Sequence, residues 1–222
     1  MLNYRVDDLS DDALAREREV QGGLAASTRA LIDAVIRSTV DDEEILEIRA
    51  QVDELTARLT KSQIAGPFGV SVTPGGTVRG HGNAVVGLRN AIAPPLAIRR
   101  DPAGRAEADF TLGAAYEGPP GMVHGGVTAL LLDQLCGEAA AAGGSPGMTG
   151  TLSLRYLRPT PLGEVSGEAW IDRTEGIKTT VKGKLETSDG VTVECEGVFI
   201  LPRWAREAMA RDAAASPPPS FE

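Results

Sequence analysis

The sequence predicts an α+β fold in which an antiparallel sheet wraps around one central helix. Two observations favour this fold. Residues 148–201 contain four runs in which apolar and polar side chains alternate, as they do in strands that bury one face. Before them stands a long, largely apolar segment at 125–142, the only central helix that the chain offers to cover such a sheet.

The first sixty residues are expected to be a helical extension of two helices, near 10–37 and 40–60. Apolar residues recur there at intervals of three and four, and Ser38-Thr39 before an acidic run indicates a capped helix start. The segment holds 14 of the 31 acidic and 7 of the 22 basic residues, so it carries −7 of the net charge of −9. We interpret it as an amphipathic cover for the core or an oligomer contact, with a partner-recognition arm as the alternative.

The segment between this extension and the central helix has a weaker pattern. Residues 61–96 are rich in glycine and proline, which favour turns and irregular structure. Short extended pieces are expected within it at 84–89 and 96–99. Residues 105–116 are typical of an exposed-edge strand.

The four alternating runs after the helix are separated by turn residues, as in hairpins. They span residues 148–158, 163–172, 177–187 and 191–201. A short helix at 205–215 and a disordered, proline-containing tail are expected to end the chain. The predicted domains are the helical extension 1–60, the sheet-and-helix domain 61–202 and the C-terminal segment 203–222.

The composition argues against several classes of function. The chain has no basic stripe of the kind that binds nucleic acid. Its N-terminus lacks the pattern of a signal peptide and no apolar stretch approaches about 18 residues, so we expect a cytoplasmic protein without membrane insertion. Two histidines and scattered acids predict no metal site. Cys136 and Cys195 lie outside any Cys-x-x-Cys pattern and are expected to fill the core.

The junction between the loop and the central helix has the most specific pattern. His124-Gly125-Gly126 opens the helix, and adjacent glycines leave first-turn N–H groups that a developing negative charge can approach. Asp133 lies eight residues beyond Gly125, roughly 12 Å along a helix axis. One helix cannot bring both groups to one carbonyl. If they cooperate, the carboxylate comes from a second copy of the chain, which implies a homodimer with its site at the interface.

This layout and motif resemble the hotdog-fold acyl-CoA thioesterases of the 4-hydroxybenzoyl-CoA and phenylacetate-pathway type. The run Glu117-Gly118-Pro119-Pro120-Gly121 is most similar to the branch that contains the mitochondrial long-chain acyl-CoA thioesterases. Met148-Thr149 and Tyr156-Leu157-Arg158-Pro159 match the family's next strand. The resemblance covers roughly residues 80–202. It implies a hydrolase without cofactors, because coenzyme A is part of the substrate, assembled as a homodimer or a dimer of dimers.

The resemblance also implies a role for each residue of the motif. The N–H of Gly125, with that of Gly126, polarises the thioester oxygen as an oxyanion hole. The partner's Asp133 acts as general base on water or as nucleophile, and the partner's Thr149 orients the water or the carboxylate. His124 mainly braces the glycine turn by hydrogen bonding, with a catalytic role as a base as the alternative.

Four further positions are candidate substrate-binding residues: Glu117, Gly118 and Gly121 in the loop, and Arg158. Many relatives place an asparagine, a second oxyanion donor, six residues before the histidine, where this chain has Gly118. Either a backbone group replaces it or Glu117 has taken on a role. Arg158 has a guanidinium that suits a coenzyme A phosphate, or it is only a surface charge.

Two other functions are considered. A non-catalytic acyl-CoA-binding hotdog protein, which senses or sequesters its ligand, is motivated by the missing asparagine and the unexplained extension. A hotdog dehydratase fits less well, because those enzymes pair a histidine base with an acid in a different local motif. A Gly-x-Ser-x-Gly string at 143–147 is predicted to be a turn, since Pro146 has no N–H at the position where a nucleophile elbow needs a donor.

Overall fold

The computed structural model describes residues 5–73, 78–94, 96–203 and 206–207. Two compact units divide the chain. One spans Val6–Ile92, and the other combines Arg5 with the residues from Ala93 onward and contains the predicted central helix.

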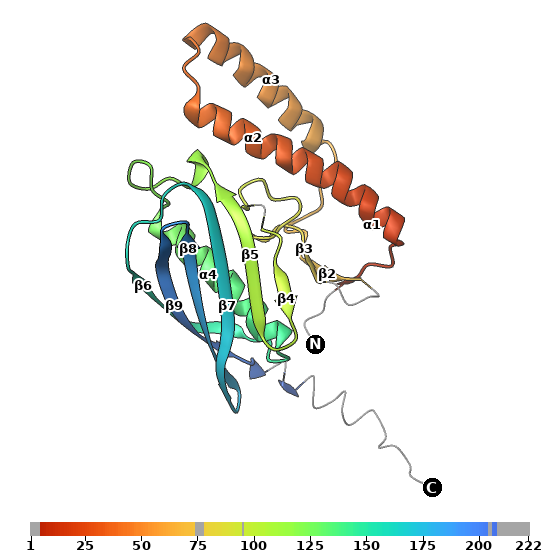
Figure 1. Cartoon of the computed structure of the whole chain (residues 1–222). Coiled ribbons are helices and arrows are strands. Elements are labelled where there is room, and N and C mark those ends of the chain that lie inside the picture. The colour runs from red at the N-terminus through yellow and green to blue at the C-terminus, as the bar shows by residue number, and fades with distance from the viewer. Residues whose placement is uncertain (1–4, 74–77, 95, 204–205, 208–222) are drawn as a thin grey trace. The chain divides into compact units, whose positions relative to one another are not determined.

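In the second unit, helix α4 (Gly125–Ala142) packs on a six-stranded antiparallel sheet (Figure 1). The strand order is β4-β5-β7-β8-β9-β6, so β4 and β6 form its edges. The strands are β4 (Arg99–Asp101), β5 (Arg105–Leu112), β6 (Met148–Tyr156), β7 (Gly163–Glu175), β8 (Lys178–Thr187) and β9 (Gly190–Ile200). A 3-10 turn, η2 (Ala114–Tyr116), follows β5. The predicted hotdog architecture, one helix wrapped by an antiparallel sheet, is confirmed.

The core of this unit lies between α4 and the sheet. Leu131, Leu132 and Leu135 of α4 have no exposed surface, and Leu185 of β8 is equally buried. Burying each such side chain contributes roughly 1.5–3 kcal/mol. Gly167 of β7 lies under α4, because a Cβ there would stand 2.5 Å from Leu135 Cδ1. The missing side chain therefore allows the helix to approach the sheet closely.

Both cysteines are buried in this core, as predicted. Cys136 of α4 and Cys195 of β9 are free thiols whose Sγ atoms lie 3.5 Å apart. A Cβ on Gly183 would stand 3.0 Å from Cys195 Sγ and 3.3 Å from Cys136 Sγ, so glycine makes room for the pair. The hydrogen bond with Cys195, and then burial, raise the pKa of the Cys136 thiol, which therefore stays protonated.

The first unit contains the helical extension and a small sheet. Its elements are β1 (Arg5–Val6), α1 (Asp11–Glu17), a π-helical segment η1 (Arg18–Gly22), α2 (Gly23–Arg37), α3 (Asp42–Thr60), β2 (Val70–Val72) and β3 (Val78–Gly80). The two predicted helices are confirmed, the first one with a π segment inside it. The cap of the second is Asp41, whose Oδ1 accepts the N–H of Glu44 over 3.0 Å.

A polar cluster joins α1 to the small sheet. Arg79 donates to Asp7 Oδ2 over 2.5 Å and also pairs with Glu17. His81 is 2% exposed, and its Nε2 lies 3.4 Å from the hydroxyl of Ser71. Burial, and then the charge of Arg79, lower the pKa of His81, so its buried ring is neutral.

Two local expectations are wrong. Residues 84–89 are not extended, because Asn83 Oδ1 accepts the N–H groups of Val85 and Val86 over 2.7 and 3.0 Å and holds the segment in turns. Strand β5 is not at an edge, because β4 pairs with it. Most of the predicted helix at 205–215, and the tail, lie outside the described residues.

Candidate active site

The start of α4 is shaped by His124, which is the N-cap residue. Its Nδ1 accepts the N–H of Gly126 over 3.0 Å, and its carbonyl oxygen accepts the N–H groups of Val127 and Thr128 over 2.9 and 3.3 Å. Nδ1 is therefore the acceptor nitrogen of the ring. His124 thus satisfies three of the four amides that open the helix.

The fourth amide of this turn belongs to Gly125. Among the described residues, its N–H makes no hydrogen bond. The carbonyl of the same residue is occupied, because Thr128 Oγ1 donates to it over 2.7 Å and Tyr156 Oη over 3.0 Å. The helix start therefore presents one unpaired donor, which is the group that an oxyanion hole requires.

Neither the backbone nor the packing demands a glycine at 125. Its φ is not positive, and a Cβ there would meet Tyr156 Oη at 3.4 Å, an ordinary contact. Gly126 is tighter, because its Cβ would stand 3.2 Å from the His124 ring. The feature that glycine adds at 125 is open access to the N–H.

The loop before His124 is held by bonds within itself. Glu117 Oε1 accepts the N–H of Gly121 over 2.6 Å, and the N–H of Gly118 donates to the carbonyl of Met122 over 2.9 Å. A Cβ at Gly118 would stand 2.8 Å from His124 Cα. Position 118, six residues before the histidine, thus has no room for a side chain, and Glu117 braces the loop.

Asp133 and Thr149 are in contact within one chain. Asp133 is half-buried on α4, and Thr149 Oγ1 of β6 donates to its Oδ1 over 2.7 Å. Asp133 lies more than two helical turns from Gly125, a rise of roughly 12 Å along α4. One chain therefore holds both halves of the predicted site but does not converge them on one carbonyl.

Arg158 contacts the start of β9. Its Nε donates to the carbonyl of Val191 over 2.9 Å, so it braces the start of β9. Tyr156 and Thr128 were not predicted as site residues. Thr128 is three residues from Gly125 on the same helix, whereas the contact of Tyr156 depends on how β6 lies against α4.

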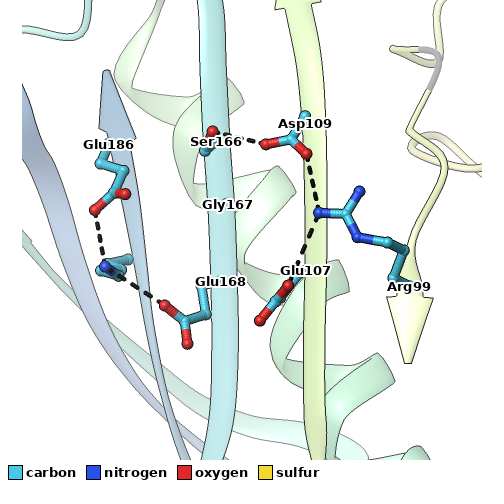
Figure 2. A pocket seen from close by; sticks show the side chains of 8 residues that line it. Arg99, Glu107, Asp109, Ser166, Gly167, Glu168 and Glu186 are labelled. Carbon is cyan, nitrogen blue, oxygen red and sulfur yellow. Dashed lines mark hydrogen bonds and ion pairs between the residues drawn. The ribbon is translucent and has the colours of Figure 1, made fainter. Parts of the chain in front are cut away.

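A separate hollow of about 240 Å³ lies on the outer face of the sheet, lined by β4, β5, β7 and β8 (Figure 2). Asp109 accepts from Ser166 over 2.7 Å and pairs with Arg99 over 2.9 Å, and these contacts hold the pKa of Asp109 below its usual value. Lys184 pairs with Glu186 over 2.8 Å, which raises the pKa of Lys184. None of the predicted site residues lines this hollow, whose charges already pair with one another.

Within the described residues, no helix combines the length and the apolar composition that a membrane crossing needs.

Comparison with known proteins gives a consistent family. The model of the thioesterase superfamily matches residues 120–194. A solved crystal structure of a thioesterase superfamily protein is 33% identical, covers 81% of this chain and 90% of its own, and superposes with a TM-score of 0.73.

Curated relatives share a shorter region. The acyl-coenzyme A thioesterase THEM4 of Xenopus laevis is 32% identical over 93 residues, which are 41% of this chain and 42% of that protein. The THEM4 protein of Mus musculus is 33% identical over 93 residues, 41% of this chain and 40% of that protein. The matched region is thus less than half the length of these relatives.

Proposed function

Because the chain belongs to the thioesterase superfamily, we propose that it is an acyl-CoA thioesterase, which hydrolyses a thioester to a free acid and coenzyme A without a metal or redox cofactor. Two copies of the chain form two equivalent sites at their interface. A cytoplasmic location and a pairing of two such dimers stay predictions from the sequence.

In the proposed reaction, water attacks the carbonyl carbon of the thioester. The partner's Asp133 takes the proton of the water, and the N–H of Gly125 stabilises the oxyanion that forms. The C–S bond then breaks, and coenzyme A leaves as a thiolate that takes up a proton. Direct attack by Asp133, through an anhydride that water then opens, is the alternative within the same site.

The observation that carries this proposal is the unpaired N–H of Gly125 in a first turn whose other amides are bonded to His124. The hydrogen bond from Thr149 to Asp133 adds support, because it fixes one carboxylate oxygen and leaves the other for water. THEM4 relatives, which are named acyl-coenzyme A thioesterases, suggest the substrate class.

Asp133→Asn tests the proposal. We expect purified protein to release free thiol from a panel of acyl-CoAs of increasing chain length, and the variant to lose roughly 10²- to 10⁴-fold in kcat with an unchanged melting temperature. Glu138→Gln, which alters a carboxylate five residues further along α4 that pairs with Arg100, is the matched control and keeps its activity. Turnover by Asp133→Asn at the wild-type rate contradicts the mechanism.

A second candidate is a non-catalytic acyl-CoA-binding protein that uses the same residues. The observation that favours it is the closed space at Gly118, which leaves the loop without a side-chain oxyanion donor. Thermal stabilisation by an acyl-CoA without thiol release supports this candidate. Multiple turnovers exclude it.

A further inference from the structure

We propose that Tyr156 is a positioning residue, which fixes the peptide group that follows the unpaired N–H of Gly125 and so holds that donor in place for the thioester oxygen. This inference rests on the proposed function and adds a residue to it.

The peptide group between Gly125 and Gly126 is held at both ends. Its N–H donates to His124 Nδ1 over 3.0 Å, and its carbonyl oxygen accepts from Thr128 Oγ1 over 2.7 Å and from Tyr156 Oη over 3.0 Å. His124 and Thr128 belong to the helix start itself and move with it. Tyr156 is the member of this set that comes from another element, β6, so it ties the helix start to the sheet.

The aromatic ring also lies beside the glycine. From the position of a Cβ on Gly125, Tyr156 Oη, Cε1 and Cζ would be 3.4, 3.5 and 3.6 Å away. The residue as a whole is nevertheless 55% exposed, so burial of the ring is not what fixes its place. The directed contact is the hydroxyl, and a phenylalanine would keep the ring position while losing it.

Strand β6 serves both halves of the site. Thr149 near its start donates to the Asp133 carboxylate, and Tyr156 at its end donates to the Gly125 carbonyl. In the proposed homodimer, these two contacts of one chain support two different sites. Anchoring of the donor by Tyr156 is therefore separable from orientation of the base by Thr149.

Tyr156→Phe tests the inference, because it removes one hydroxyl and no ring atoms. Ser153→Ala is the matched control, since Ser153 lies three residues earlier on β6 and is exposed. Losing one hydrogen bond of ordinary strength predicts a fall of roughly 3- to 10-fold in kcat/KM with acyl-CoA, because the donor contacts the carbonyl oxygen in the bound substrate as well as in the transition state. Ser153→Ala keeps the wild-type kcat/KM.

A second measurement does not depend on turnover. We expect Tyr156→Phe to speed amide hydrogen exchange in residues 126–128 relative to wild type and to Ser153→Ala. We also expect it to weaken by a similar factor the binding of a 2-oxoalkyl-CoA, which keeps the carbonyl but carries a CH₂ between it and the sulfur and is not hydrolysed. Melting temperatures are measured alongside, to check that the variants remain folded.

The outcomes separate the two proposals. Faster exchange together with weaker analogue binding supports the role of Tyr156, even if the wild type releases no thiol and the proposed hydrolase function fails. Unchanged exchange, or unchanged analogue binding and kcat/KM, overturns the role of Tyr156 while leaving Asp133→Asn to decide the hydrolase.

Discussion

Gly125 differs from the nearby glycines because its lack of a side chain leaves its N–H open to a ligand and is not needed for packing inside the protein. Gly118 and Gly126 have their space filled by His124, whereas Gly125 has room for a Cβ. Its N–H is the unpaired amide of the first turn. The amide group is therefore the part of this residue that the proposed chemistry uses, and it can be removed without removing the helix.

A pair of substitutions at Gly125 separates the amide from the side chain. Gly125→Pro lacks the N–H, yet proline suits the first helical position, and His124 already has the extended backbone (φ −62, ψ 132) that precedes a proline. We expect a loss of about 10²- to 10³-fold in kcat. Gly125→Ala keeps the N–H and should lose far less. Equal kcat values for the two variants, measured by thiol release, would show that this amide has no role.

Helix geometry fixes the separation of His124-Gly125-Gly126 from Asp133, so the sequence alone predicts that one chain cannot complete the site. The roles of these residues and of Thr149 are implied only by the resemblance to the hotdog thioesterases. The bond from Tyr156 to Gly125 spans 31 positions and depends on how an edge strand lies against a helix. No pattern of residue types encodes that register.

At the scale of elements, the close packing of α4 on the sheet requires glycine only at positions where an added Cβ would clash. Gly167 of β7 lies under Leu135, while Gly137 of α4 itself would place a Cβ 3.5 Å from Phe199 Cε1, an ordinary distance. Adding the same methyl group should therefore have opposite effects in the two elements.

Gly167→Ala is expected to lower the free energy of unfolding by about 1–3 kcal/mol, because it overpacks the core. Gly137→Ala should leave that free energy unchanged or raise it by up to about 1 kcal/mol, since alanine favours a helix interior. Denaturant titration of both variants checks this. A Gly167→Ala protein as stable as the wild type would mean that α4 does not pack as described.

The cluster that joins α1 to the small sheet predicts a pH dependence. In the folded chain the pKa of His81 lies below its ordinary value of 6.5, so between the folded pKa and 6.5 the unfolded chain binds more protons. The contribution of His81 to the free energy of unfolding is therefore fully present above about pH 6.5 and is lost as the pH falls toward the folded pKa. Thermal unfolding from pH 7.5 to 5 should show this slope, and His81→Gln should reduce it. A slope that is the same in His81→Gln would assign it to other groups.

Helices and strands could be predicted from the sequence where apolar residues recur at a regular spacing over a long segment. The alternating runs after residue 148 and the helical pattern at 125–142 agree with β6 to β9 and with α4. Residues 61–96 show no repeating hydrophobic pattern. The strands there, β2 and β3, are only three residues each, and the Asn83 side chain sets the turns after them. β5 appeared to be an edge because the partner strand β4 is too short to leave a signal.

At the scale of the whole molecule, one chain carries parts of two proposed sites. Gly125 and Asp133 face different substrates if two copies assemble. This arrangement makes a prediction about mixtures of inactive proteins.

Mixing Asp133→Asn with Gly125→Pro should restore activity. In a mixed dimer, one site receives the intact Gly125 of the first chain and the intact Asp133 of the second, while the other site has both changes. Mixed dimers should therefore show about half of the wild-type activity, whereas each parent alone stays inactive. Thiol release is measured after subunit exchange, with light scattering to confirm a dimer. No recovery after complete subunit exchange would contradict the shared site.

The two buried thiols can report on local unfolding, in which α4 separates from the sheet. Cys136 and Cys195 are the two cysteines of the chain, 0% and 7% exposed. An alkylating reagent reaches them only when α4 separates from β9, so the rate of labelling counts those separations. The same shielding keeps the protein's own thiols out of a colorimetric assay that counts the sulfhydryl of released coenzyme A.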